Sequence, residues 1–112
     1  MATRRSPDAI RTDFEQAVNM APAELEAWLA TEDSRKVGFI RRGENESVGH
    51  RSGRRIVTLL RTRTGELEDD DYAHMRRVVG FVRRHLAQRP RGDVTQTRWR
   101  YSLMNWGHDP LK

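Results

Sequence analysis

The stretch that decides the fold lies at residues 69–89 and reads DDDYAHMRRVVGFVRRHLAQR. Apolar side chains recur in it at spacings of three and four, which is the period of one face of an α-helix. The three aspartates at its start favour a helix N-terminus, because the macrodipole is positive there, and the proline at position 90 ends the pattern. We therefore predict a long central helix over residues 72–89. Its core face consists of Tyr72, Met75, Val79, Val82 and Leu86.

Three shorter helical patterns come before this helix. The first covers residues 7–19 and is capped by Ser6. The second opens at Pro22, since proline is favoured in the first helical turn. The third runs from residue 32 to about residue 38, after the capping residue Thr31.

Residues 41–51 carry glycine and polar side chains without an apolar period, so they predict a loop. A helix follows from about residue 52 to 63, and Gly65 ends it. Beyond Pro90, Asp93 or Thr95 can cap a final helix. The core face of that helix consists of Trp99, Leu103 and Trp106.

No segment alternates with the period of a β-strand, and 112 residues are the size of one compact domain. The expected fold is therefore all-α: a compact orthogonal bundle of about five or six helices around a single core. Residues 1–112 form a single helical domain in this interpretation, with residues 1–6 as a flexible arm.

The composition restricts the chemistry and the location. The chain contains no cysteine, which excludes disulfides, a thiolate nucleophile and cysteine-bound zinc. No segment approaches the roughly 20 apolar residues of a membrane span, and no apolar stretch of a signal peptide follows the basic N-terminus. We expect a cytoplasmic protein without membrane association.

The charge is distributed unevenly along the chain. Residues 1–50 carry seven basic and nine acidic side chains, a net −2, whereas residues 51–112 carry fourteen basic and seven acidic ones, a net +7. Only two of the 21 basic residues are lysines, and the planar guanidinium of arginine matches phosphate groups bidentately. This asymmetry indicates a surface that faces a polyanion.

The C-terminal part of the chain has a familiar appearance. Residues 97–110 read TRWRYSLMNWGHDP, residues 84–90 read RHLAQRP, and residues 49–56 read GHRSGRRI. In these stretches the chain resembles a family of small bacterial and fungal proteins of unknown function, and the likeness covers nearly the whole sequence. Some members of that family are described as DNA-binding. The resemblance implies no reaction, but it favours nucleic-acid binding.

Two arginine-rich helices carry the candidate binding surface. Seven arginines lie on or next to them, in positions that can contact several phosphates. They are Arg51, Arg54, Arg55, Arg76, Arg77, Arg83 and Arg84. Arg76, Arg77, Arg83 and Arg84 form one stripe that faces away from the core. The competing interpretation is a solvated face, whose arginines are neutralised by Glu66, Glu68 and residues 69–71 at the intervening turn.

The run Arg98-Trp99-Arg100-Tyr101 alternates arginine with aromatic side chains, as surfaces for single-stranded nucleic acid do. Helical spacing favours a core position for Trp99, which leaves Arg98, Arg100 and Tyr101 as candidates at the rim of the binding surface. A helix-turn-helix over residues 22–30 and 32–39 is a weaker alternative, because its recognition helix would begin with two acidic residues.

The four histidines do not form a metal-binding pattern. His74 and His85 are eleven residues apart, about 16 Å along one helix, which is too far to share an ion. His108 and Asp109 are typical of a helix C-terminus with a buried turn. His50 and Ser52 are candidate anion ligands, because the loop enters a helix N-terminus there.

These observations predict a small basic, non-enzymatic DNA-binding protein that needs no cofactor or metal. We expect double-stranded DNA as the partner, contacted mainly at its phosphates, because no helix carries the Asn, Gln and Arg mixture of a recognition element. Two alternatives stay open. One is a protein-interaction module or homodimer in which the acidic half meets the basic half, and the other is a nuclease that uses His50 or His108.

Overall fold

The computed structural model describes residues 5–112, and its regular secondary structure in that range is helical. The first half contains α1 (Pro7–Ala17), α2 (Pro22–Leu29) and α3 (Glu32–Lys36). The second half contains α4 (Val48–Leu60), the 3-10 turn η1 (Thr64–Glu66), α5 (Asp69–Leu86) and α6 (Arg98–Asn105). Within the described residues no strand forms, and one isolated bridge joins Ile40 to Ser47. The all-α prediction is confirmed.

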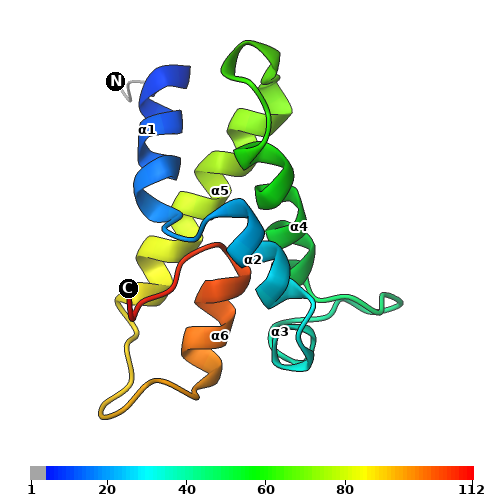
Figure 1. The fold of residues 1–112 in the computed structure, drawn as a ribbon, viewed down its shortest axis with the longest axis vertical. Coiled ribbons are helices and arrows are strands. Elements are labelled where there is room, and N and C mark those ends of the chain that lie inside the picture. Colours follow the sequence, from blue (N-terminus) through cyan, green and yellow to red (C-terminus); the bar gives the residue numbers. More distant parts are fainter. Residues whose placement is uncertain (1–4) are drawn as a thin grey trace.

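The helices form two packed pairs that α6 connects (Figure 1). The long α5 lies against α1, and α2 lies against α4. The short C-terminal helix α6 contacts α2, α3, α4 and α5. The helix that joins the others is therefore α6, rather than the long α5 that the sequence placed at the centre.

One apolar core runs through the bundle and receives side chains from five of the helices. Phe14, Leu25, Ile56, Met75 and Leu103 are among its largest fully buried members. Tyr72 packs on its edge as predicted. The prediction was wrong for Leu86, which is 37% exposed because it is the last residue of α5. Val78, which the predicted core face did not include, is fully buried and belongs to the core.

Capping residues set several helix starts as predicted. The hydroxyl of Ser6 accepts a hydrogen bond from the backbone N–H of Ala9, at 3.2 Å, and the hydroxyl of Thr31 accepts one from that of Ser34, also at 3.2 Å. The cap of α6 is a correction, because it is Thr97 rather than Asp93 or Thr95. The Asp93 carboxylate instead accepts from Thr95 within its own turn.

The predicted loop over residues 41–51 is too long, because α4 begins at Val48 and is capped by Ser47. The loop prediction extended too far because Gly49 and Gly53 were interpreted as loop residues. A Cβ on Gly53 would lie 2.5 Å from the backbone oxygen of Asn105, and one on Gly49 would lie 3.0 Å from Nε1 of Trp106. Both glycines allow α6 to approach α4 closely, so here they indicate helix packing and not a loop.

The other helix boundaries differ by a few residues. The structure ends α4 at Leu60, well before Gly65, and places α5 at residues 69–86 instead of 72–89. The three aspartates therefore form the first turn of α5, where the positive end of the helix dipole favours them. None of the helices in residues 5–112 is both long and apolar enough to cross a bilayer.

Candidate functional site

The three predicted arginines of α4 all have carboxylate partners. The guanidinium of Arg54 donates to both oxygens of Glu46, at 2.8 and 2.6 Å, and this outweighs burial and lowers the pKa of Glu46 to about 2. The other two pairs are Arg51 with Glu44, at 2.9 Å, and Arg55 with Asp71, at 3.3 Å. This side of the predicted surface is therefore largely neutralised within the molecule.

The arginines of α5 differ from those of α4 in this respect. Arg76, Arg77 and Arg84 form no ion pair with any carboxylate in the described part of the chain, and Arg83 reaches Asp13 only at 3.8 Å. Of the five acidic side chains at the turn between α4 and α5, only Asp71 pairs with an arginine. The acidic turn therefore does not neutralise the α5 arginines.

The stripe of four arginines on α5 borders two different surfaces. Arg77 and Arg84 line a cleft on the side of α4, whereas Arg76 and Arg83 line a shallow hollow beside α1, with a volume of about 170 Å³. On an α-helix, residues seven positions apart, such as Arg77 and Arg84, lie on nearly one line along the helix surface. Neighbouring residues, such as Arg76 and Arg77, point about 100° apart, so the two pairs of arginines face different sides of α5.

The cleft beside α4 consists of two adjoining hollows of about 500 and 190 Å³. We call it the α4–α5 cleft. The two hollows share Arg41, Val48, Arg77 and Trp106. Five arginines line it against a single carboxylate, that of Glu44. The five are Arg41, Arg51, Arg55, Arg77 and Arg84. The cleft therefore carries an excess of positive charge.

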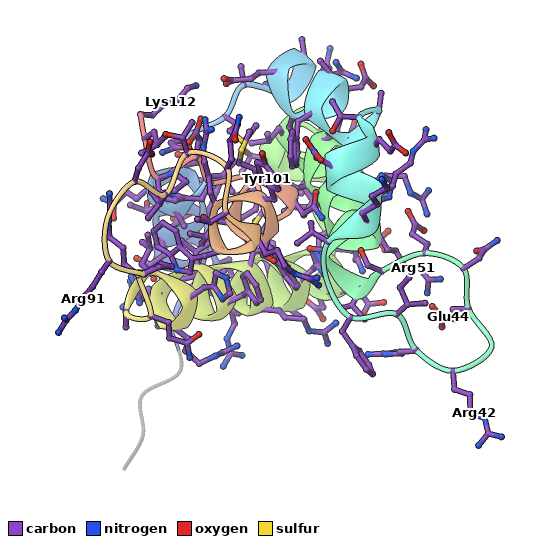
Figure 2. The ribbon with its side chains drawn as sticks, turned by 90° about the horizontal axis from the view of Figure 1, so that it is seen from below. Arg42, Glu44, Arg51, Arg91, Tyr101 and Lys112 are labelled. Atoms are coloured by element: carbon purple, nitrogen blue, oxygen red, sulfur yellow. The ribbon has the colours of Figure 1, made fainter. Side chains whose placement is uncertain are left out.

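The loop before α4 forms one wall of this cleft and projects from the bundle. Figure 2 shows Arg42 at its outer end pointing away from the protein, while Glu44 turns back toward Arg51. Arg91 extends from a second loop on the opposite side of the molecule. Basic side chains thus reach outward from the loop between α3 and α4 and from the loop between α5 and α6.

A column of stacked rings forms the floor of the cleft. The ring of Phe81 stacks on that of Trp106, with centroids 4.4 Å apart, and on that of His85, at 4.9 Å. His74 continues the column beyond Trp106, and Trp99 continues it beyond His85. Because the rings cover one another's faces, they form a rigid apolar base under the arginines.

Two histidines of this column are neutral near pH 7. Burial, together with the positive charges of Arg55 and Arg77, lowers the pKa of His74 to about 4, and its Nε2 lies 2.9 Å from the hydroxyl oxygen of Ser52. Burial also lowers the pKa of His85. Within residues 5–112, Nε2 of His85 is the one buried side-chain nitrogen or oxygen that lacks a hydrogen-bond partner.

The structure gives His50 and Ser52 other partners than an anion. The two ring nitrogens of His50 face a carboxylate oxygen of Glu46 and, at 2.8 Å, the backbone oxygen of Leu29. Both partners are acceptors, and the negative charge of Glu46 repels an anion at this position. Ser52 is buried against His74. The two residues therefore present no free donor at the start of α4.

The arginine and aromatic residues of α6 serve mainly as packing residues. Arg100 donates to both oxygens of Asp109, at 3.2 and 3.1 Å, and to the backbone oxygen of Thr95. Tyr101 packs against Trp28, with ring centroids 5.3 Å apart. Of the three predicted rim residues, Arg98 alone is exposed and has no ion pair in the described range.

The weaker sequence interpretations find little geometric support. The second helix of the candidate helix-turn-helix, α3, has only five residues. No group of three or more metal-ligating side chains occurs among residues 5–112.

The C-terminal end of α6 has the buried turn that the sequence predicted at His108 and Asp109. Gly107 has a φ of +83°, and the ring of His108 forms a hydrogen bond with the backbone oxygen of Ala17, at 2.7 Å.

Several residues of the cleft were missed in the sequence, among them Phe39, Arg41 and Trp106. Phe39 and Arg41 lie in the loop before α4, and Trp106 was interpreted as core alone. A signal was present, because an apolar pair followed by two arginines, Phe-Ile-Arg-Arg at residues 39–42, is unusual in a loop. Without the fold, nothing indicates that this loop lies next to α5.

The fold and the cleft define a small, basic, all-helical protein with an arginine-lined hollow over an aromatic floor. The chain belongs to the family described as "Protein of unknown function (DUF3140)", whose pattern matches residues 13–104. No curated protein and no solved structure matches the chain.

Proposed function

We propose that the protein is a non-enzymatic nucleic-acid-binding protein that contacts the phosphates of DNA with the unpaired arginines of α5 and the neighbouring loop. The observation that carries the proposal is the contrast between the two helices. Arg76, Arg77 and Arg84 lack carboxylate partners among the described residues, whereas Arg51 and Arg54 of α4 are paired.

Unpaired guanidinium groups are the stronger phosphate ligands. A paired arginine must first give up its carboxylate, and an exposed ion pair is worth about 0.2–1 kcal/mol. An unpaired one gains the counterion release of each phosphate contact without this loss. We therefore assign the main contacts to Arg41, Arg76, Arg77 and Arg84, and a smaller share to Arg51, Arg54, Arg55 and Arg83.

Salt dependence gives this proposal a measurable form. Each phosphate neutralised on duplex DNA contributes about −0.9 to the slope of log K against log salt concentration. Four contacts predict a slope of about −3.6 for the wild-type protein. Removal of three of the four arginines then reduces the slope to about −1.

The test is a fluorescence-anisotropy titration of a labelled DNA duplex at several salt concentrations. One variant combines Arg76→Gln, Arg77→Gln and Arg84→Gln. Its control combines Arg5→Gln, Arg11→Gln and Arg61→Gln, which changes the net charge equally but removes arginines that lie outside the proposed surface and are already paired with carboxylates.

We expect the α5 variant to lose at least tenfold in duplex affinity at about 50 mM salt, and the control to lose less than threefold, because only the first removes free phosphate ligands. Equal losses in both variants would show that net charge alone matters and that α5 is not the binding surface. If the wild-type protein binds neither duplex nor single-stranded DNA even at low salt, the proposal is overturned.

A further inference from the structure

We propose that the α4–α5 cleft holds one unstacked base of single-stranded nucleic acid, whose neighbouring phosphates lie on Arg41, Arg77 and Arg84. This inference rests on the proposed function and specifies its preferred ligand. Two independent features of the cleft carry it: an exposed aromatic ring at its edge and unpaired arginines around it.

The exposed ring belongs to Phe39, whose residue is 71% exposed although it lines the larger hollow. Its backbone is held in place, because the backbone oxygen of Phe39 accepts a 2.9 Å hydrogen bond from the N–H of Val48. The ring therefore stays at the cleft while its surface remains in water. A base that stacks on such a ring contributes about 1–3 kcal/mol.

The charged groups are arranged to receive a strand and not a neutral ligand. Arg41, Arg77 and Arg84 line the same hollow as Phe39, and none of them pairs with a carboxylate in the described residues. The one carboxylate that borders the cleft, Glu44, is bound to Arg51. Cationic side chains interleaved with an aromatic ring are typical of sites for single-stranded nucleic acid.

The hollow is large enough to admit a base. Its volume of about 500 Å³ lies within the range for small-ligand pockets, about 300–1,000 Å³. Both faces of a base are already covered by its neighbours in a duplex, so stacking on Phe39 requires a base that is unstacked. Single strands supply such bases at a lower cost than duplexes do.

The experiment measures the affinities of three labelled probes by fluorescence anisotropy at about 100 mM salt. The probes are a twenty-residue oligothymidylate, a duplex of the same length, and an abasic oligomer of twenty residues that keeps the phosphates but lacks the bases. The variants are Phe39→Ala, Phe39→Tyr as a rescue that keeps the ring, and Ile40→Ala as a control. Ile40 is also exposed, at 45%, but does not line the cleft. Thermal unfolding confirms that each variant folds.

We expect the wild-type protein to bind oligothymidylate at least fivefold more tightly than the abasic strand or the duplex. Phe39→Ala should remove this preference without changing duplex affinity, Phe39→Tyr should retain it, and Ile40→Ala should have no effect. Such a result supports a base in the cleft, because the abasic strand presents the same phosphate charges.

Other outcomes separate the two proposals. If the three probes bind equally, and the Arg76, Arg77 and Arg84 variant weakens all of them, the phosphate surface stands and the base site is overturned. If no probe binds even at low salt, both are overturned. A dimer that forms without nucleic acid and dissociates on Phe39→Ala would show that Phe39 serves a protein contact, which also overturns the base site.

Discussion

The side-chain oxygen of Asn105 accepts a hydrogen bond of 2.8 Å from the indole N–H of Trp28, although 77 positions separate the two residues. The same oxygen accepts a hydrogen bond from the hydroxyl of Ser34, and the amide nitrogen of Asn105 donates to the backbone oxygen of Ser34, at 3.0 Å. Asn105 is only 1% exposed. One buried amide therefore connects α6 to α2 and α3.

Asn105→Ala is expected to lower the free energy of unfolding by about 3 kcal/mol or more, because three polar groups lose their buried partner at about 1 kcal/mol or more each. Urea denaturation followed by tryptophan fluorescence measures the change. Gln96→Ala, at an exposed position between α5 and α6, serves as the control and should stay within about 0.5 kcal/mol. A loss of less than 1 kcal/mol at Asn105 would contradict this role.

Two helical glycines should respond oppositely to alanine. The added Cβ of Gly53→Ala would meet the backbone oxygen of Asn105 at 2.5 Å and a methyl group of Leu29 at 2.6 Å, so α4 and α6 must separate. We expect a loss of about 2 kcal/mol or more in the free energy of unfolding. The Cβ of Gly80→Ala meets only the flexible end of Arg84, at 3.0 Å.

Gly80→Ala should therefore be neutral or stabilising by up to about 1 kcal/mol, since alanine favours the helix more than glycine does. Thermal unfolding of both variants under one set of conditions gives the comparison. A similar melting temperature for the two would show that the close contact at Gly53 is relieved without separating the helices.

His74 should make the protein sensitive to mild acid. Burial first of all, with the charges of Arg55 and Arg77, lowers its pKa from 6.5 to about 4 in the folded chain. Between these values the unfolded chain binds more protons than the folded one, so stability is complete above pH 6.5 and falls as the pH decreases toward 4. We expect a loss on the order of 2 kcal/mol over this range.

His74→Gln provides the matched comparison, because glutamine does not titrate and still offers Ser52 a hydrogen-bonding group. Urea denaturation at pH 7, 5.5 and 4.5 should show a smaller decrease for the variant than for the wild-type protein. Carboxylates with lowered pKa values, such as Glu46, are present in both proteins and cancel in the difference. Identical pH profiles would show that protonation of His74 does not oppose folding.

The helical fold was predictable because its signals are local. The period of apolar residues in 69–89 and the capping side chains Ser6 and Thr31 act within a few positions, and the structure confirms them. The start of α4 was not predictable in this way. Gly49 and Gly53 resemble loop residues in the sequence, and only their contacts with Trp106 and Asn105 explain why the helix needs them.

The candidate site was less accessible to sequence reasoning, because charge pairing is a long-range property. Arg54 and Arg84 look alike in the sequence, yet one has Glu46 beside it and the other has no carboxylate partner in the described chain. The cleft likewise depends on a loop that lies next to α5 only in the folded chain. Composition indicated that arginines matter, but only the structure separates paired from unpaired ones.

Because Arg100 is paired with a carboxylate and Arg84 is not, we expect substitution of the first to lower stability and substitution of the second to lower nucleic-acid affinity. Arg100 holds Asp109, which is 8% exposed, and although burial opposes it, the bidentate contact keeps the pKa of that carboxyl below its ordinary value. Arg100→Gln leaves this carboxylate without its partner, so we expect a loss of about 2 kcal/mol in the free energy of unfolding. Nucleic-acid affinity should change less than twofold, because Arg100 is already engaged within the fold.

Arg84→Gln should weaken nucleic-acid binding and leave the free energy of unfolding nearly unchanged. Its guanidinium forms no ion pair with the described carboxylates, so stability should stay within about 0.5 kcal/mol, whereas affinity at about 50 mM salt should fall about threefold or more through the loss of one phosphate contact. Urea denaturation and anisotropy titration on the same two preparations give both quantities. A large stability loss in Arg84→Gln, or a large affinity loss in a folded Arg100→Gln protein, would show that ion pairing within the fold does not distinguish binding arginines from structural ones.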